Sequence, residues 1–170
     1  MITPIVKEPH PILHVKAVTV PEITPEIQRL IDTMIETMHV ADGVGLAANQ
    51  INSKWNILVV SPDGHKGKEM VLLNAQILQR SGRAHSPEGC LSVPGVSAEV
   101  TRSAKLTITG LDRQGQRVTC ATDGLLAKIL QHEVDHLQGH LFLDRLGHWQ
   151  RRRLFQKYES LTDALRKIRV

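Results

Sequence analysis

Apolar residues recur at helical spacing near the start of the chain. Thr24, Pro25 and Glu26 form a cap, a first-turn proline and an acidic first turn, which together are typical of a helix N-terminus. A single apolar stripe follows, made of Ile27, Leu30, Ile31, Met34, Ile35 and Met38. This pattern predicts an N-terminal helix with one face packed in the core.

Two further segments show the same helical period. In the first, Thr122 and Asp123 are candidate caps, Gly139 is a candidate stop, and apolar residues occupy positions 125, 126, 129 and 130. In the second, the stripe consists of Leu154, Tyr158, Leu161, Leu165 and Ile168. The first predicts a partly buried helix, and the second an amphipathic C-terminal helix with one face on the body of the protein.

Short apolar runs between these helices are typical of strands. They cover residues 56–60, 70–73, 106–109 and 116–119. Turn sequences at 61–64 and 112–115 separate neighbouring runs, and the second predicts a hairpin. Strands combined with two or three helices indicate a single α+β domain spanning residues 1–170.

The second helix carries the sequence His132-Glu133-Val134-Asp135-His136. Residues four apart share a helix face, so both imidazoles can bind one metal ion while the glutamate handles a proton beside it. A structural zinc site uses four protein ligands and needs no adjacent glutamate, so the motif favours a hydrolytic site. A charged helix face that matches the motif by chance is the alternative.

A third metal ligand is needed, and the downstream candidates are weak. Position 142, where one protease class has histidine, is Phe142; His140 follows the helix stop, and Glu159 lies in a basic segment. Upstream, Cys90 stands between a glycine and a proline-bounded segment, and a thiolate binds such metals well. Cys120 ends an apparent strand and is interpreted as a small buried hydrophobe.

Residues 43–50 are unusually rich in small side chains. They permit close contact with a substrate or with a neighbouring helix. A phosphate-binding loop is disfavoured, because the segment lacks the Gly-Lys-Ser/Thr ending.

Residues 43–50, 88–92 and 131–136, with the later 139–146, resemble in order and spacing the signature motifs of peptide deformylases. The resemblance implies mostly antiparallel strands around a central helix that carries the histidines. It also implies hydrolysis of the formyl group from the N-formylmethionine of nascent polypeptides. The implied metal ligands are Cys90, His132 and His136, and the implied native ion is Fe²⁺, with Zn²⁺, Ni²⁺ or Co²⁺ as alternatives.

The expected catalytic groups surround this metal site. Glu133 is the expected general base and later proton donor. The family resemblance implies that the Gln50 side-chain amide and the Leu91 backbone N–H stabilise the oxyanion on the formyl carbon.

The small formyl group suggests selection by shape. A tight wall formed by Val44, Gly45 and Gly89 is expected to admit formyl and exclude acetyl. Leu125 and Ile129, one to two turns before His132, are candidate linings of an apolar methionine pocket, although they are equally explained as core residues. Lys128 is expected to border this pocket with its aliphatic stem.

Composition places the protein among compact enzymes of the cytoplasm. Its 170 residues are 41% hydrophobic and include two cysteines, so no disulfide framework is expected. No apolar run reaches membrane-spanning length and no signal pattern opens the chain. Neither a membrane nor DNA is an expected partner.

Positive charge is concentrated at the C-terminus. Residues 148–170 hold seven Lys or Arg against two acidic residues, a net of +5, whereas the whole chain carries +4 and the remainder therefore −1. A basic outward face suggests contact with ribosomal RNA near the nascent-chain exit, while a merely solvated face is the alternative.

Two other classes of protein remain in competition. A zinc endopeptidase shares the helix motif but needs a downstream third ligand. An RNA-binding module with a structural metal accounts for the basic C-terminus but leaves Glu133 and Gln50 without a role.

Overall fold

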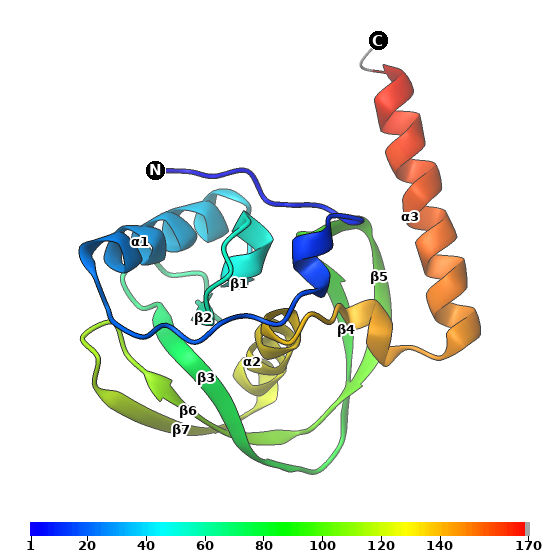
Figure 1. Cartoon of the computed structure of the whole chain (residues 1–170). Helices are drawn as coiled ribbons and strands as arrows, with labels where there is room; N and C mark the ends of the chain where they lie inside the picture. Colours follow the sequence, from blue (N-terminus) through cyan, green and yellow to red (C-terminus); the bar gives the residue numbers. More distant parts are fainter. Residues whose placement is uncertain (169–170) are drawn as a thin grey trace.

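The computed structural model describes residues 1–168 and consists of three α-helices, seven strands and three single 3₁₀ turns (Figure 1). Arg169, which contributes to the basic C-terminus, and the side chain of Ile168 lie outside the described residues. The helices are α1 (Pro25–Val40), α2 (Gly124–Leu137) and α3 (His148–Ile168). The strands are β1 (Gly45–Ala47), β2 (Ile57–Val60), β3 (Met70–Ser81), β4 (Ala84–Cys90), β5 (Val93–Arg102), β6 (Lys105–Leu111) and β7 (Arg117–Asp123). The 3₁₀ turns are η1 (Pro11–His14), η2 (Ala48–Ile51) and η3 (Phe142–Arg145).

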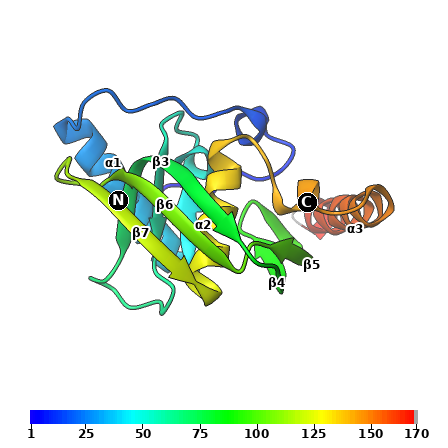
Figure 2. The same ribbon diagram turned by 90° about the horizontal axis from the view of Figure 1, so that it is seen from below.

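All strand pairs in the two sheets are antiparallel. One sheet has the order β1-β2-β3-β6-β7, and the other consists of β4 and β5. Helix α2 lies between the sheets, with strands on either side of it (Figures 1 and 2). The predicted α+β class and the central histidine-bearing helix are confirmed. The hairpin predicted at 112–115 joins β6 to β7.

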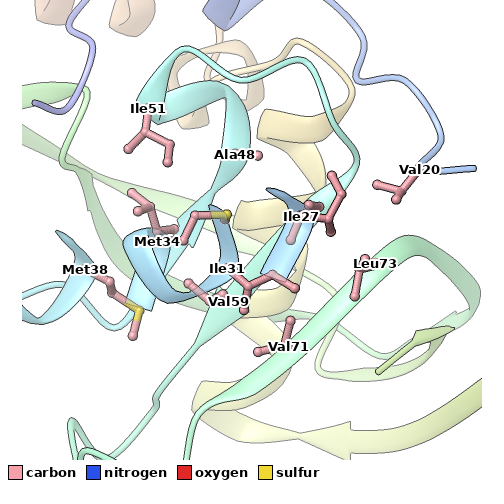
Figure 3. Packing of buried hydrophobic residues seen from close by; sticks show 12 residues of the cluster. Val20, Ile27, Ile31, Met34, Met38, Ala48, Ile51, Val59, Val71 and Leu73 are labelled. Carbon is pink, nitrogen blue, oxygen red and sulfur yellow. The ribbon is translucent and has the colours of Figure 1, made fainter. Parts of the chain in front are cut away.

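Helix α1 covers one part of the large sheet through its predicted stripe. The Thr24 hydroxyl accepts a hydrogen bond from the Ile27 N–H, and Pro25 starts the helix, as expected. Ile31 and Met34 are fully buried and pack with residues of β1, β2 and β3 (Figure 3). The stripe therefore fixes α1 on the sheet by apolar contact.

Helix α2 is buried along most of its length. Ala127 and Leu130 pack against β2, β3 and β6 in a second apolar cluster. Asp123 occupies the N-cap, but its side chain makes no capping hydrogen bond, so the cap prediction is right in position and wrong in mechanism. Gly139 ends the helix with φ of +79°, and a Cβ there would lie 2.7 Å from the His14 carbonyl oxygen.

Three strands have no counterpart in the predicted pattern. β4 and β5 contain proline, glycine and charged residues in place of an apolar alternation, and β1 has three residues. Backbone hydrogen bonds to a partner strand stabilise these three strands. β4 and β5 pair with each other, and β1 pairs with β2 at the edge of the large sheet. The run predicted at 70–73 is the start of a twelve-residue strand, β3.

Helix α3 projects from the body, and only part of its apolar stripe is covered (Figure 1). Leu154 and Tyr158 pack in a third cluster with β5 and η3, whereas Leu165 is 62% exposed. The expectation that the stripe lies on the body is therefore wrong for its later part. No helix within residues 1–168 is both long enough and apolar enough to span a membrane.

Tyr158 ties α3 to the N-terminal segment. Its buried hydroxyl donates to the Glu8 carbonyl oxygen at 2.8 Å. We expect Tyr158→Phe to lower the free energy of unfolding by about 1 kcal/mol, because it leaves that carbonyl without its donor. Urea denaturation measures the change.

The matched control is Ser160→Ala on the exposed side of the same helix. Equal stability of Tyr158→Phe and the parent chain would contradict the assigned contact.

Candidate active site

Three potential metal ligands meet between β4 and α2. Cys90 ends β4, while His132 and His136 lie one turn apart on α2. Their ligand atoms all lie within 4.8 Å of one another, and the Cys90 Sγ is 3.2 Å from the His136 Nε2. Metal-ligand bonds of about 2.0–2.3 Å can bridge such a group with little side-chain movement.

The alternative ligands stay apart from this group. His140 and Glu159 are exposed, and neither joins the cluster found within the described part of the chain. Cys120 is half-buried on β7 against the second apolar cluster, in keeping with its interpretation as a packing residue.

Cys90 and His132 strongly affect each other's protonation. Burial disfavours the thiolate, but the facing imidazoles outweigh it and hold the pKa of the Cys90 thiol well below its usual value. Burial likewise opposes the His132 imidazolium, but Cys90 and Glu88 raise the pKa of His132 well above its usual value. A thiolate is therefore already favoured where a positive charge stands beside it.

The His132 ring is oriented by a carboxylate. Its Nδ1 lies 3.0 Å from Glu88 Oε2, which leaves Nε2 as the ring's ligand atom. His136 is fully buried, and its backbone carbonyl accepts a hydrogen bond from the Asn49 amide at 2.6 Å. The His132 ring is thus oriented through the nitrogen that does not face the cysteine, whereas His136 is held through its backbone and its Nδ1 has no partner within the described residues.

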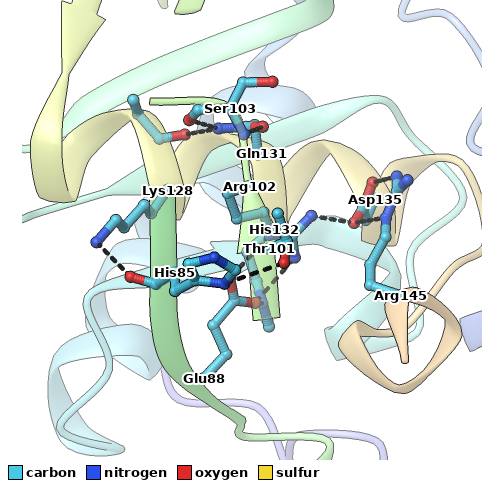
Figure 4. A network of polar contacts seen from close by, with 11 residues as sticks. His85, Glu88, Thr101, Arg102, Ser103, Lys128, Gln131, His132, Asp135 and Arg145 are labelled. Atoms are coloured by element: carbon cyan, nitrogen blue, oxygen red, sulfur yellow. Dashed lines mark hydrogen bonds and ion pairs between the residues drawn. The ribbon is translucent and has the colours of Figure 1, made fainter. Parts of the chain in front are cut away.

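Behind the ligands runs a buried chain of ion pairs (Figure 4). Arg102 donates to both Glu88 oxygens at 2.7 and 2.8 Å and to Asp135 at 2.5 Å. Arg145 donates to both oxygens of Asp135. Burial opposes ionisation of Glu88, but Arg102 and His132 lower its pKa to about 2. Glu88 therefore remains a carboxylate at neutral pH.

Glu133 occupies a closed space beside the ligands. It is 3% exposed, and its Oε2 has no hydrogen-bond partner among the described residues. Burial raises its pKa, although His132 and His136 oppose this. A Cβ on Gly45 would lie 2.4 Å from Glu133 Oε1, so only glycine leaves room for this carboxylate.

Gln50 is held with its amide nitrogen toward the cysteine. Its Oε1 accepts from the Ala47 N–H at 2.9 Å, which fixes the amide orientation. Its Nε2 then donates to Ser92 Oγ at 3.2 Å and lies 3.6 Å from Cys90 Sγ. The predicted group of Gln50, Cys90 and Leu91 is thus assembled from η2 and the turn after β4.

The N-terminal segment joins these two parts of the site. The Val6 N–H donates to the Gln50 carbonyl at 2.7 Å, and the Glu8 N–H donates to the Ser92 carbonyl at 2.9 Å. Between them, the Lys7 ammonium donates to the Leu91 carbonyl. Burial lowers the pKa of Lys7, while the Cys90 thiolate opposes that shift.

A cavity of about 470 Å³ opens onto the site, and all five expected substrate-binding residues line it. Val44 and Leu125 are 42% and 55% exposed at its rim, whereas Ile129 is buried and also belongs to the core. Ile129 is therefore a core residue that also lines the cavity, whereas the core interpretation is wrong for the exposed Leu125; the methionine pocket stays a prediction. A Cβ on Gly89 would meet only an ordinary contact at 3.5 Å, so this glycine is less constrained than Gly45.

Sequence reasoning missed several residues that shape the site. Glu88 lies in the motif at residues 88–92 and Asp135 in the motif at residues 132–136, but neither was assigned a role. Both are acidic residues flanking ligands, a signal that could have marked them as supports. Lys7 and Arg102 carry no local signal, because only the fold brings them to the site.

Sequence comparisons with known proteins point to the family whose motifs the chain resembles. The family model described as polypeptide deformylase matches residues 2–152. A peptide deformylase from Nitrosococcus oceani is 43% identical over 152 residues, which are 89% of this chain and 91% of that protein.

Similar solved structures belong to the same family. The crystal structure of a peptide deformylase from Legionella pneumophila is 37% identical, with a TM-score of 0.93 over 97% of this chain and 98% of that one. A peptide deformylase from Ehrlichia chaffeensis, solved in complex with actinonin, is 34% identical, with a TM-score of 0.87 over 94% of this chain and 96% of that one.

The contact between Glu88 and His132 leads to a prediction about metal affinity. We expect Glu88→Gln to weaken binding of Zn²⁺ or Co²⁺ by roughly 10- to 100-fold, because an amide holds the imidazole less firmly than a carboxylate does. Competition with a chromogenic chelator measures the affinity.

Glu99→Gln on the exposed side of β5 is the control, and thermal unfolding checks that both variants are folded. Unaltered affinity in Glu88→Gln would show that this carboxylate does not support the ligand.

Proposed function

The chain belongs to the peptide deformylase family of metal-dependent hydrolases, and from this premise we propose how its own residues carry out the reaction. The enzyme removes the formyl group from the N-terminal N-formylmethionine of newly synthesised proteins and releases formate. In this hydrolysis the formyl C–N bond breaks and a C–O bond to water forms.

Glu133 acts as the general base and then as the acid. The observation that carries this role is its buried carboxylate, with one oxygen unpartnered within the described chain and a raised pKa, beside the three ligands. A carboxylate with a raised pKa accepts a proton from the attacking water more readily and returns it to the departing amine. Gly45 keeps the space in front of it open.

Gln50 and Leu91 stabilise the oxyanion. The Gln50 amide nitrogen already points toward Cys90 Sγ. The Leu91 N–H belongs to the turn that directly follows Cys90 at the end of β4. Loss of one donor of this kind typically costs about 2.7–4 kcal/mol of transition-state stabilisation. The N-terminal segment supports both donors by bonding to the backbone next to each of them.

Cys90, His132 and His136 hold the divalent metal, and Fe²⁺ is the proposed native ion, with Zn²⁺, Ni²⁺ or Co²⁺ as substitutes. When bound, the ion supplies Lewis-acid chemistry, since it lowers the pKa of water and polarises a carbonyl oxygen. The protein supplies two imidazoles and a cysteine whose thiol pKa is already well below its usual value. His132 must release a proton when the metal binds, because a protonated ring nitrogen cannot act as a ligand.

Shape selects the formyl group, and an apolar pocket takes the methionine side chain. Val44, Gly45 and Gly89 form the wall around the formyl carbon, and Gly45 is its tightest point. Leu125 and Ile129 line the pocket for the methionine side chain.

The whole chain, residues 1–170, is proposed to be one catalytic domain that acts on nascent chains in the cytoplasm. Exposed basic residues on α3 are proposed to contact ribosomal RNA. Three of them follow one another closely, at Arg152, Arg153 and Lys157. This contact places the enzyme beside its substrate.

The test of the catalytic assignment is Glu133→Ala. We expect metal content to be retained and formate release from a formyl-Met peptide to fall by roughly 10²- to 10⁴-fold, because the proton carrier is lost. Glu159→Ala is the control, and it also removes the downstream ligand that an endopeptidase would need.

Unchanged formate release in Glu133→Ala would overturn this mechanism. Internal cleavage of the peptide with its formyl group intact would instead identify an endopeptidase.

The iron assignment predicts sensitivity to oxygen. We expect aerobic purification to lose iron and formate release together, because the thiolate ligand is open to oxidation, while anaerobic purification retains both. Metal analysis and activity are measured on the same samples. Full activity with zinc alone would contradict the assignment.

The ribosome contact predicts a strong dependence on salt. We expect the triple change Arg152→Glu, Arg153→Glu and Lys157→Glu to abolish salt-sensitive co-sedimentation with ribosomes, while activity on a free formyl-Met peptide stays the same. The control reverses three exposed charges elsewhere, at Lys66, Lys68 and Arg117. Equal co-sedimentation of both triple variants would refute the role of α3.

A further inference from the structure

Two polar side chains, Ser86 and Lys128, line the same cavity as the apolar residues proposed to hold methionine. Ser86 lies on β4 and is 9% exposed, and Lys128 lies on α2 and is half-buried. A pocket that served only a thioether side chain would need neither group.

Their position follows from the way β4 faces α2. Alternate residues of a strand share a face, as do residues four apart on a helix, and two strand residues span about 6.7 Å against about 6.0 Å for four helical residues. An irregularity between Gly89 and Cys90 interrupts the strand at the metal site, but Ser86 and Glu88 share one face of β4, and Lys128 and His132 share one face of α2. Glu88 contacts His132, and one step further from the metal site Ser86 and Lys128 both line the cavity.

Lys128 crosses the gap between the two elements. Its ammonium donates to the His85 carbonyl oxygen on β4 at 3.4 Å (Figure 4). This bond is long, and an ammonium has three donors, so hydrogen-bonding capacity remains for a ligand. Glu88, on the same side of β4 as Ser86, already bonds to Arg102 and His132.

Ser86 adds a second donor at the same place. Most of the residue is buried, and it lines the cavity. A serine hydroxyl can both donate and accept hydrogen bonds, so it can serve a ligand that enters there. Together the two residues present an ammonium and a hydroxyl toward the outer part of the pocket.

We propose that this pocket also accepts methionine sulfoxide, so that the enzyme removes the formyl group from polypeptides that begin with oxidised N-formylmethionine. The sulfinyl oxygen is a strong acceptor that an apolar pocket would leave unpaired, whereas Lys128 and Ser86 can donate to it. The aliphatic stem of Lys128 still contacts an unoxidised thioether, so both substrates fit. The hydrolysis itself is unchanged: water attacks the formyl carbon, and formate leaves.

The sulfoxide sulfur is chiral, and the two donors are held at fixed positions on β4 and α2. The two epimers direct their oxygens differently from the same sulfur position, so they do not meet the donors equally well. The enzyme is therefore expected to prefer one epimer. This inference rests on the proposed function, because it uses the proposed location of the methionine pocket.

The experiment compares kcat/KM for a formyl-Met tripeptide and for each epimer of its sulfoxide, using the metal-loaded enzyme. We expect the parent enzyme to hydrolyse the preferred epimer within about 10-fold of the methionine substrate. Lys128→Met should lower kcat/KM for that epimer by at least 10-fold more than for methionine, since a hydrogen bond to a charged group is lost. Ser86→Ala should act in the same direction, and Lys128→Arg should restore most of the sulfoxide activity.

Lys66→Met, on an exposed loop, is the control and should leave the ratio of the two substrates unchanged. Hydrolysis of formyl-Met without hydrolysis of either sulfoxide overturns the inference and leaves the proposed function standing. An unchanged substrate ratio in Lys128→Met also overturns it. Failure to hydrolyse any of the peptides overturns the inference and the proposed function together.

Discussion

The active site depends on one buried guanidinium. Arg102, on β5, bonds to Glu88 on β4 and to Asp135 on α2, so it joins the small sheet to the central helix. The side chains of all three are almost fully withdrawn from water. A buried arginine between two carboxylates is stable only when its bonds are well formed, which makes this contact sensitive to the relative position of the two elements. That position is what brings the cysteine of one element to the histidines of the other.

The candidate site residues could be identified from the sequence because their chemistry is local. Two histidines and a glutamate on one helix turn, a cysteine beside glycine and a run of small residues are visible without a fold, and the structure brings them to one cavity. The helix α1 stripe was equally clear, because its period is regular. In contrast, β4 and β5 carry no alternation, since each strand combines turn residues with positions that serve the site. Arg102 and Lys7 could not have been predicted, because their contacts join residues far apart in the chain.

Close approach of backbone is a second constraint on the site. At Gly45 the edge strand β1 passes so near Glu133 that any side chain would enter the space of the carboxylate. Burial of the carboxylate raises its pKa, although His132 and His136 oppose the shift. The absence of a side chain at position 45 thus gives Glu133 its room, while burial of the carboxylate raises its proton affinity.

The bond from Tyr158 to the Glu8 carbonyl spans 150 residues of sequence. Glu8 in turn bonds to Ser92, and its neighbour Lys7 bonds to Leu91, in the turn that follows the cysteine. Such long-range contacts form late, because the intervening chain must be ordered first. During synthesis the Tyr158 bond can form only after α3 has been made, so the N-terminal segment that contacts the site gains this support later than its bonds to Gln50 and Ser92.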